Sequence, residues 1–100
     1  MAVVHVEWPA FLSREAGKVG KGWVAIDEEV AAGTTVIALL SLIAATDSGF
    51  RESVFNPDVG TVNEQVSVIL NDTLLSFDEI WHTPLADRDA VKLLPIYSGG

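Results

Sequence analysis

The sequence predicts an α+β domain in which one main helix packs across a mixed sheet of four to five strands. Three observations favour this class. The chain has 100 residues, which suffice for one domain, so residues 1–100 are expected to fold as a single unit. Hydrophobic residues make up 49% of the chain and charged residues 20%, which is typical of a well-filled core. Segments with strand-like and helix-like periodicity then follow one another along the chain.

Two strands are predicted in the first third of the chain, joined as a hairpin. In the first strand Val4, Val6 and Trp8 alternate with Val3, His5 and Glu7, and in the second Val24, Ile26 and Val30 face away from Asp27 and Glu29. Pro9 lacks an N–H and limits central pairing at the end of the first strand. Residues 17–22 are expected to form the hairpin loop and not a phosphate cradle, because no Gly-Lys-Ser/Thr ending follows.

The main helix is predicted to begin after Thr35, whose hydroxyl can accept a hydrogen bond from the first turn. Val36, Leu39, Leu40 and Ile43 recur at helical spacing, and residues 47–49 supply the stop. Residues 30–46 carry no charge, but this run is short and interrupted by polar residues. We therefore interpret it as a buried core helix and not a membrane span. No secretory signal is visible before it.

The second half of the chain is expected to contain two further strands. A helical turn and a loop lead to a strand at residues 66–70, and Asn71-Asp72 makes a tight turn into Leu74 and Leu75. A polar connection from Asp78 to Asp89 then reaches the last strand, in which Val91 and Leu93 alternate with Lys92 and Leu94. Trp8 and Trp23 are expected in the core or at its edge, and Trp81 in the core or at a partner contact.

Composition excludes several function classes. Fourteen acidic and six basic residues give a net charge of −8, which would repel a nucleic-acid backbone, so we expect a basic protein partner and neither nucleic acid nor membrane. The absence of cysteine excludes thiolate zinc sites and cysteine catalysis, and it fits a reducing cytoplasm. His5 and His82 lie far apart in sequence, so no metal site is expected. Asp87 and Asp89 are expected to bond the backbone of a turn.

Three blocks of sequence carry a family resemblance. They are Asn71-Asp72, Thr83-Pro84-Leu85-Ala86-Asp87-Arg88-Asp89-Ala90-Val91, and Leu94-Pro95-Ile96-Tyr97-Ser98-Gly99-Gly100. With the order of elements, they resemble the MoaD/ThiS family of ubiquitin-like sulfur carriers, which implies the β-grasp fold with a flexible Gly-Gly tail at residues 95–100. Residues 51–60 resemble the longer connection of archaeal MoaD-like carriers and of the CysO-type carriers of cysteine synthesis. Arg88 stands where the family often has Gly, and Ala90 where it often has Glu, so a differently shaped turn is expected.

The resemblance implies that the working group is the α-carboxyl of Gly100. That group has a reference pKa of ~3.3–3.7, so at neutral pH it is a carboxylate and a poor electrophile that needs activation. The resemblance implies an activating enzyme of the MoeB/ThiF adenylyltransferase type, which uses ATP to form an acyl-adenylate that sulfur converts to a thiocarboxylate. Gly99 and Gly100 lack a Cβ and can thread a narrow channel. The chain is then a protein co-substrate and not an enzyme, and it binds no cofactor itself.

Strand alternation predicts where a partner docks. If Val66, Val68, Leu70, Val91 and Leu93 face the helix, Ile69 and Leu94 face outward. Pro95, Ile96, Tyr97 and Ser98 continue that apolar strip toward the reactive end, and such a strip is typical of a partner surface. The alternative is that Ile69 and Leu94 are isolated exposed apolar residues, which are common.

The expected function is sulfur donation in molybdopterin (molybdenum or tungsten cofactor) biosynthesis or a related pathway. The large subunit of molybdopterin synthase is the first candidate for the sulfur-accepting enzyme. Alternatives are a ubiquitin-like modifier joined to lysines through Gly100, a sulfur carrier for thiamine or cysteine synthesis, and an interaction domain with an inert tail.

Overall fold

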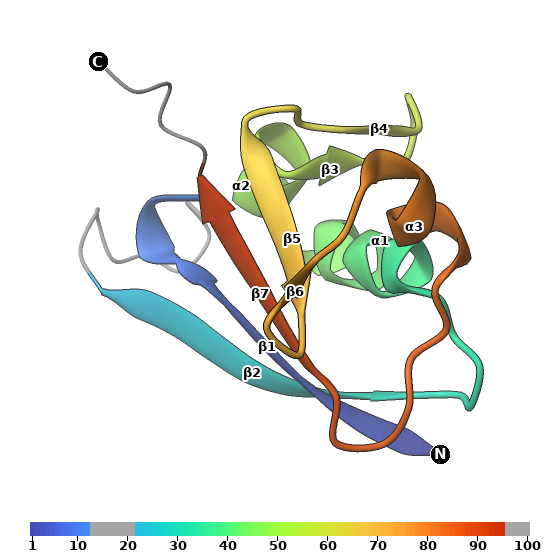
Figure 1. The fold of residues 1–100 in the computed structure, drawn as a ribbon. Helices are drawn as coiled ribbons and strands as arrows, with labels where there is room; N and C mark the ends of the chain where they lie inside the picture. The colour runs from blue at the N-terminus through green and yellow to red at the C-terminus, as the bar shows by residue number, and fades with distance from the viewer. Residues whose placement is uncertain (13–21, 96–100) are drawn as a thin grey trace.

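A five-stranded mixed sheet forms the centre of the structure, and helix α1 packs across one of its faces (Figure 1). The structure is a computed structural model that describes residues 1–12 and 22–95. The strands of the sheet are β1 (Ala2–Pro9), β2 (Trp23–Val30), β5 (Val66–Leu70), β6 (Thr73–Leu74) and β7 (Ala90–Pro95). Their order is β2-β1-β7-β5-β6, with β1 and β7 parallel and the other neighbours antiparallel.

The remaining elements lie outside this sheet. The helices are α1 (Val36–Thr46), α2 (Ser48–Ser53) and α3 (Phe77–His82), with a 3₁₀ turn at Ala10–Leu12. β3 (Phe55–Asn56) and β4 (Thr61–Val62) form a small separate hairpin. This architecture confirms the predicted α+β class, the mixed sheet and the one main helix.

The hairpin of β1 and β2 has the register that the alternation predicts. It pairs Ala2 with Val30 at one end and Pro9 with Trp23 at the other. The inward residues Val4, Val6 and Trp8 are at most 2% exposed. β7 pairs with β1 at residues 5–7 alone, well before Pro9. The predicted loop at residues 17–22 lies outside the described residues except for Gly22.

The ends of α1 also match the prediction. The Thr35 side chain accepts a hydrogen bond from the Ala38 N–H at 3.4 Å. Asp47 ends α1, and its carboxylate then accepts from the Phe50 N–H at 2.9 Å, so it caps α2 as well. No helix of the described chain has both the length and the apolar character needed to cross a bilayer.

The core lies between the sheet and α1. Its largest fully buried side chains are Phe50, Leu39, Leu40, Leu93, Val4, Val6, Val36, Val54, Val68 and Val91. Trp8 packs edge-on against Phe50 with 5.0 Å between the ring centroids, which joins the sheet to α2. Tight packing of this kind holds β7, and therefore the point from which residues 96–100 continue, in a fixed place.

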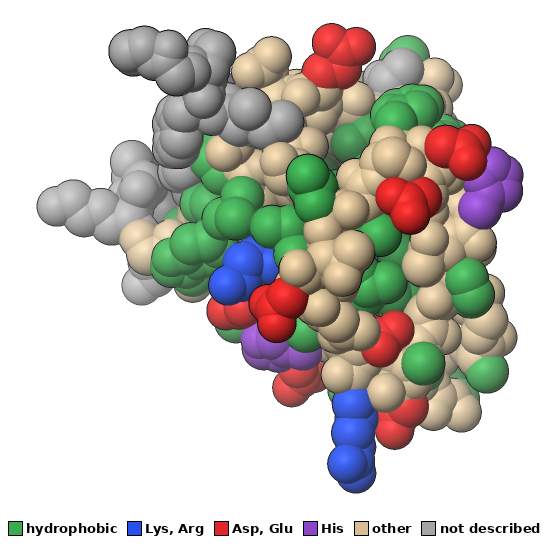
Figure 2. All heavy atoms as spheres, in the orientation of Figure 1, with side chains coloured by type: hydrophobic (Ala, Val, Ile, Leu, Met, Phe, Trp, Pro, Cys, Tyr) green, Lys and Arg blue, Asp and Glu red, His purple; other side chains and the backbone are tan. Residues whose placement is uncertain are grey.

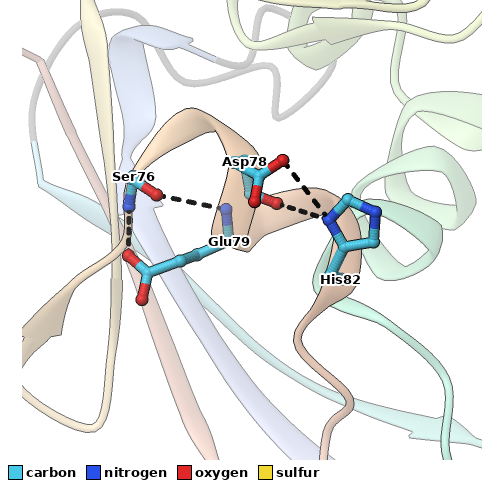
Figure 3. A network of polar contacts seen from close by, with 4 residues as sticks. All are labelled: Ser76, Asp78, Glu79 and His82. Carbon is cyan, nitrogen blue, oxygen red and sulfur yellow. Dashed lines mark hydrogen bonds and ion pairs between the residues drawn. The ribbon is translucent and has the colours of Figure 1, made fainter.

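Helix α3 corrects the expectation of a polar connection from Asp78 to Asp89, because a short helix occupies its first part. Ser76 and Glu79 form a capping box: the Ser76 hydroxyl accepts from the Glu79 N–H at 3.2 Å, and the Glu79 carboxylate accepts from the Ser76 N–H at 2.8 Å (Figure 3). The Nδ1 atom of His82 lies 3.0 Å from the Asp78 carbonyl oxygen at the other end. The β3–β4 hairpin likewise replaces part of an expected loop.

Candidate functional site

The face of the sheet opposite α1 carries the predicted docking residues. Ile69 lies opposite Lys92 and Leu94 lies opposite Ser67 in the β5–β7 register, so Ile69 and Leu94 are diagonal neighbours on one face. Both are half-buried, whereas Val68 and Leu93, which face the helix, are at most 1% exposed. A hollow of about 450 Å³ lies on this face and is lined in part by Ile69, Lys92 and Leu94.

Figure 2 shows hydrophobic side chains gathered over β2, β7 and β5 on this face, beside a basic side chain and with acidic ones next to them. Ile69 and Leu94 are therefore part of a larger group of apolar side chains and are not isolated. A rimmed apolar strip of this kind is a surface suited to a protein partner. We call the strip formed by Trp23, Ile69, Lys92 and Leu94 the outer-face strip.

Trp23 belongs to this strip, and the expectation that it lies in the core or at its edge is wrong. Its side chain is 52% exposed, and the Lys92 ammonium lies 5.8 Å from the centroid of its ring. The alternation in β2 could have predicted this exposure, because Trp23 is in phase with Asp27 and not with Val24 and Ile26. The expectation for Trp8 is confirmed, since Trp8 is 2% exposed. Trp81 is partly buried and packs against the core.

Pro95 follows Leu94 at the end of β7 but, contrary to the expectation, does not share its face. It lies half-buried opposite Val66, which belongs to the core, so Pro95 is on the helix side of the sheet. Five predicted site residues lie outside the described residues, and their roles stay predictions: Ile96, Tyr97, Ser98, Gly99 and Gly100. The structure therefore brings together Ile69 and Leu94 on the outer face, with Pro95 next to Leu94 at the point where the described chain ends.

The loop before β7 is fixed by side-chain hydrogen bonds. The Asp89 carboxylate accepts from the Ala86 N–H at 2.8 Å and from the Asn71 amide at 2.9 Å. The Asn71 side-chain oxygen in turn accepts from the Ala90 N–H at 2.9 Å. These bonds tie the start of β7 to the β5–β6 turn, in which Asn71 and Asp72 have φ values of 48° and 68°.

The same loop is also tied to β1. The Asp87 carboxylate accepts from the Val3 N–H at 2.8 Å, and the Arg88 N–H donates to the Val3 carbonyl at 2.8 Å. The expectation that these aspartates bond the backbone of their turn is thus confirmed for Asp89, whereas Asp87 bonds the backbone of β1. The two motif blocks around residues 71 and 83–91 set the register of the strand that leads to the tail.

Polar side chains border the outer-face strip on the β1–β2 side. Nδ1 of His5 lies 2.9 Å from Oδ1 of Asp27, and both side chains are well exposed, at 45% and 70%. No group of three His, Cys, Asp or Glu side chains within residues 1–12 and 22–95 is arranged to hold a metal ion. What this surface offers is a hydrophobic contact area with polar borders, which suits binding to another protein.

Sequence comparison places residues 20–100 within the ThiS family. The chain belongs to this family. It is also 34% identical over 71 residues to the sulfur carrier protein CysO of Mycobacterium tuberculosis, a match that covers 70% of this chain and 76% of CysO. This ThiS-family chain is therefore a member of the ubiquitin-like sulfur carriers. It is not an enzyme.

Solved structures agree with that placement. The crystal structure of Mycobacterium tuberculosis CysO superimposes with a TM-score of 0.66 at 30% identity and covers 94% of this chain and 99% of its own. Small archaeal modifier protein 1 of Haloferax volcanii gives a TM-score of 0.70 at 22% identity, covering 97% and 100%. A putative molybdopterin converting factor subunit 1 of Pyrococcus furiosus gives 0.65 at 24% identity, covering 97% and 100%. The last two show the fold alone, which is the predicted β-grasp.

Proposed function

We propose that this chain carries sulfur as a thiocarboxylate on Gly100. The carboxylate oxygen of Gly100 attacks the α-phosphorus of ATP on an activating enzyme, pyrophosphate leaves, and an acyl-adenylate forms. Hydrosulfide, or a sulfur donor equivalent to it, then attacks the carbonyl carbon, AMP leaves, and a C–S bond replaces the C–O bond. The carrier contributes the carbonyl and the docking surface, while its partner supplies ATP and the catalytic groups.

One observation carries this proposal: the outer-face strip runs along β7 to Leu94, from which six residues continue to Gly100. A partner that covers Ile69 and Leu94 receives the next residues of the chain directly. Membership of the ThiS family and the identity to CysO support the same chemistry. We expect the partners to be an adenylyltransferase of the MoeB/ThiF type and a sulfur-accepting enzyme.

The acceptor decides the pathway. The identity of 30% to CysO against 24% to the Pyrococcus protein favours an acceptor of the cysteine-synthesis kind. Molybdopterin synthesis, which the sequence alone placed first, remains the second candidate, with the large subunit of the synthase as acceptor. Reactions of the thiocarboxylate with each candidate acceptor enzyme, followed by product analysis, distinguish the two. The cytoplasmic location stays a prediction.

Intact mass spectrometry tests sulfur carriage. The purified chain is incubated with ATP, an activating enzyme and sulfide. We expect a mass gain equal to the exchange of one oxygen for one sulfur, located on Gly100 by fragmentation. Larger conjugates that release Gly-Gly remnants on lysines would instead support a ubiquitin-like modifier. As a control, the activating enzyme is shown to be active on its own carrier. If the mass of this chain then stays unchanged, the result supports an interaction domain with an inert tail.

A further inference from the structure

The outer edge of β5 is only half covered. β6 has two residues and pairs with Ile69 and Leu70, so among the described strands none pairs with Val66 or Ser67 on that side. A strand edge without a neighbour presents backbone N–H and C=O groups, which are a template for one more strand. This edge lies on the side of β5 away from β7.

Hydrogen bonds along the strand show which groups face that edge. The Leu75 N–H donates to the Val68 carbonyl at 2.9 Å, so the backbone groups of Val68 point away from β7. Backbone groups alternate along a strand, so those of Val66 point the same way. The Val66 N–H donates to the Asn63 carbonyl at 3.0 Å, which leaves the Val66 carbonyl directed to the uncovered edge.

A groove with a volume of about 360 Å³ runs beside this edge, between β5, β6 and α3, which lie next to one another in Figure 1. Its walls are mainly apolar; the lining residues that matter here are Val62, Val66, Leu74, Phe77 and Ile80. Leu74 and Phe77 are 64% and 58% exposed, so an occupant would remove a large apolar area from water.

Charge selects among occupants. Glu64 is the one charged side chain among the described residues that line the groove, and Asp78 and Glu79 follow Phe77 in α3. A second copy would bring another net charge of −8. Residues 96–100 of the chain itself contain no basic side chain to face Glu64. Both occupants are therefore disfavoured, and a basic segment of a different protein is favoured.

We propose that the groove binds an extended segment of a partner protein, which adds as a strand beside Val66 and Ser67 and donates a backbone N–H to the Val66 carbonyl. Every second residue of the segment is apolar and contacts Leu74 and Phe77, and a Lys or Arg faces Glu64. Val66 lies opposite Pro95, so the groove begins level with the end of β7. A partner that holds the tail can therefore reach the groove with a neighbouring segment.

A titration followed by NMR tests this proposal with the full chain. The probe is a short capped peptide of alternating lysine and valine. Two matched controls carry one N-methyl group each, on neighbouring central residues, because only one of the two amides faces β5 in an added strand. We expect amide shifts at residues 63–68 and 74–77, and a loss of about tenfold in affinity for one control peptide alone. Equal binding of both controls, or shifts confined to the outer-face strip, would overturn the proposal.

Two variants distinguish binding of the peptide in the groove from a general attraction of the peptide by the net charge of the chain. Leu74→Lys places a cation in the groove and removes an apolar contact, and we expect about tenfold weaker binding of the lysine–valine peptide. Val59→Lys adds the same charge at a side chain that is 68% exposed and does not line the groove, and we expect little change. Equal loss in both variants would show attraction by net charge alone. If Leu74→Lys fails to fold, Glu64→Gln serves in its place.

The free chain reveals whether another occupant is present. Nuclear Overhauser contacts from the Tyr97 ring to methyl groups of Leu74 would assign the groove to the tail. A dimer in sedimentation that Leu74→Lys dissociates would assign it to a second copy. Either result overturns the proposal. The test uses neither ATP nor an activating enzyme, so its outcome is separate from that of sulfur carriage.

Discussion

At the scale of single residues, Arg88 has the most unusual backbone. Its φ of 72° lies in the left-handed region, which costs a residue with a Cβ about 1–2 kcal/mol and which glycine adopts freely. The sequence suggested a differently shaped turn because Arg replaces Gly here. Arg88 instead takes a glycine-like conformation, because its N–H and the carboxylates of Asp87 and Asp89 fix the loop.

Arg88→Gly should therefore stabilise the fold. We expect a gain of about 0.5–1 kcal/mol in the free energy of unfolding, after part of the relieved strain is offset by the greater entropy of glycine in the unfolded chain. Urea denaturation measures it. Arg88→Ala is the matched control, since it removes the same 93% exposed side chain and charge but keeps the Cβ. Equal stability of the two variants would contradict the strain argument.

Trp23 yields the second prediction at this scale. If the outer-face strip contacts the activating enzyme, Trp23→Ala should lower kcat/KM for adenylation about tenfold, because aromatic residues at interface centres carry much of the binding energy. A steady-state assay of pyrophosphate release measures this. Leu42→Ala is the control, because Leu42 is 48% exposed but lies on α1, across the core from the strip. An equal effect of both substitutions would remove Trp23 from the docking surface.

At the scale of elements, α3 depends on its capping box. The Ser76 backbone N–H donates to the Glu79 carboxylate, and this bond, followed by the nearby Ser76 side chain, lowers the pKa of Glu79 below its ordinary value of 4.5. A lowered pKa in the folded state means that Glu79 stabilises the fold when ionised. That contribution is present above pH 4.5 and is lost as the pH falls through the lower folded value.

Glu79→Gln should make the stability of the fold less dependent on pH in this acidic range. We expect the variant to lose less stability than the wild type as the pH falls below 4.5. Urea midpoints measured at a series of pH values give the comparison. Parallel curves for the wild type and Glu79→Gln would show that the capping box carries no pH-dependent stability.

Long elements, in which the periodic pattern repeats several times, were predictable, and short elements were not. Alternation over residues 3–8 and 24–30 and helical spacing over 36–46 gave β1, β2 and α1 with nearly correct ends. The six residues of α3 and the two-residue strands β3 and β4 are too short to show a period. The capping box Ser76-x-x-Glu79 was the one local signal for α3.

At the scale of the whole molecule, the order of strands came from the resemblance and not from periodicity. Nothing local specifies that β7 pairs in parallel with β1, because that pairing joins residues 5–7 to residues 90–92. The predicted docking residues Ile69 and Leu94 followed instead from strand alternation, because each is out of phase with the buried residues of its own strand. The exposure of Trp23 and the groove beside β5 were not predicted. The exposure of Trp23 depends on the exact phase of β2, and the groove depends on the shortness of β6.

The net charge of −8 acts over the whole surface and predicts salt-dependent association. The Debye length falls from about 10 Å at 0.1 M to about 3 Å at 1 M ionic strength, so added salt should slow the encounter with a basic activating enzyme. Stopped-flow association rates should fall as sodium chloride rises, while kcat at saturating carrier stays constant. Association rates that do not change with the sodium chloride concentration would mean that net charge does not contribute to the selection of partners.

The central claim is that the carbonyl of Gly100 is the working group and that the folded body presents it. Adding one alanine after Gly100 tests this most directly, because the extension changes neither the sheet nor the outer-face strip. The account predicts an unchanged Tm and complete loss of the oxygen-to-sulfur mass gain when the extended chain is incubated with ATP, activating enzyme and sulfide. An extended chain that gains sulfur as fast as the wild type would contradict it.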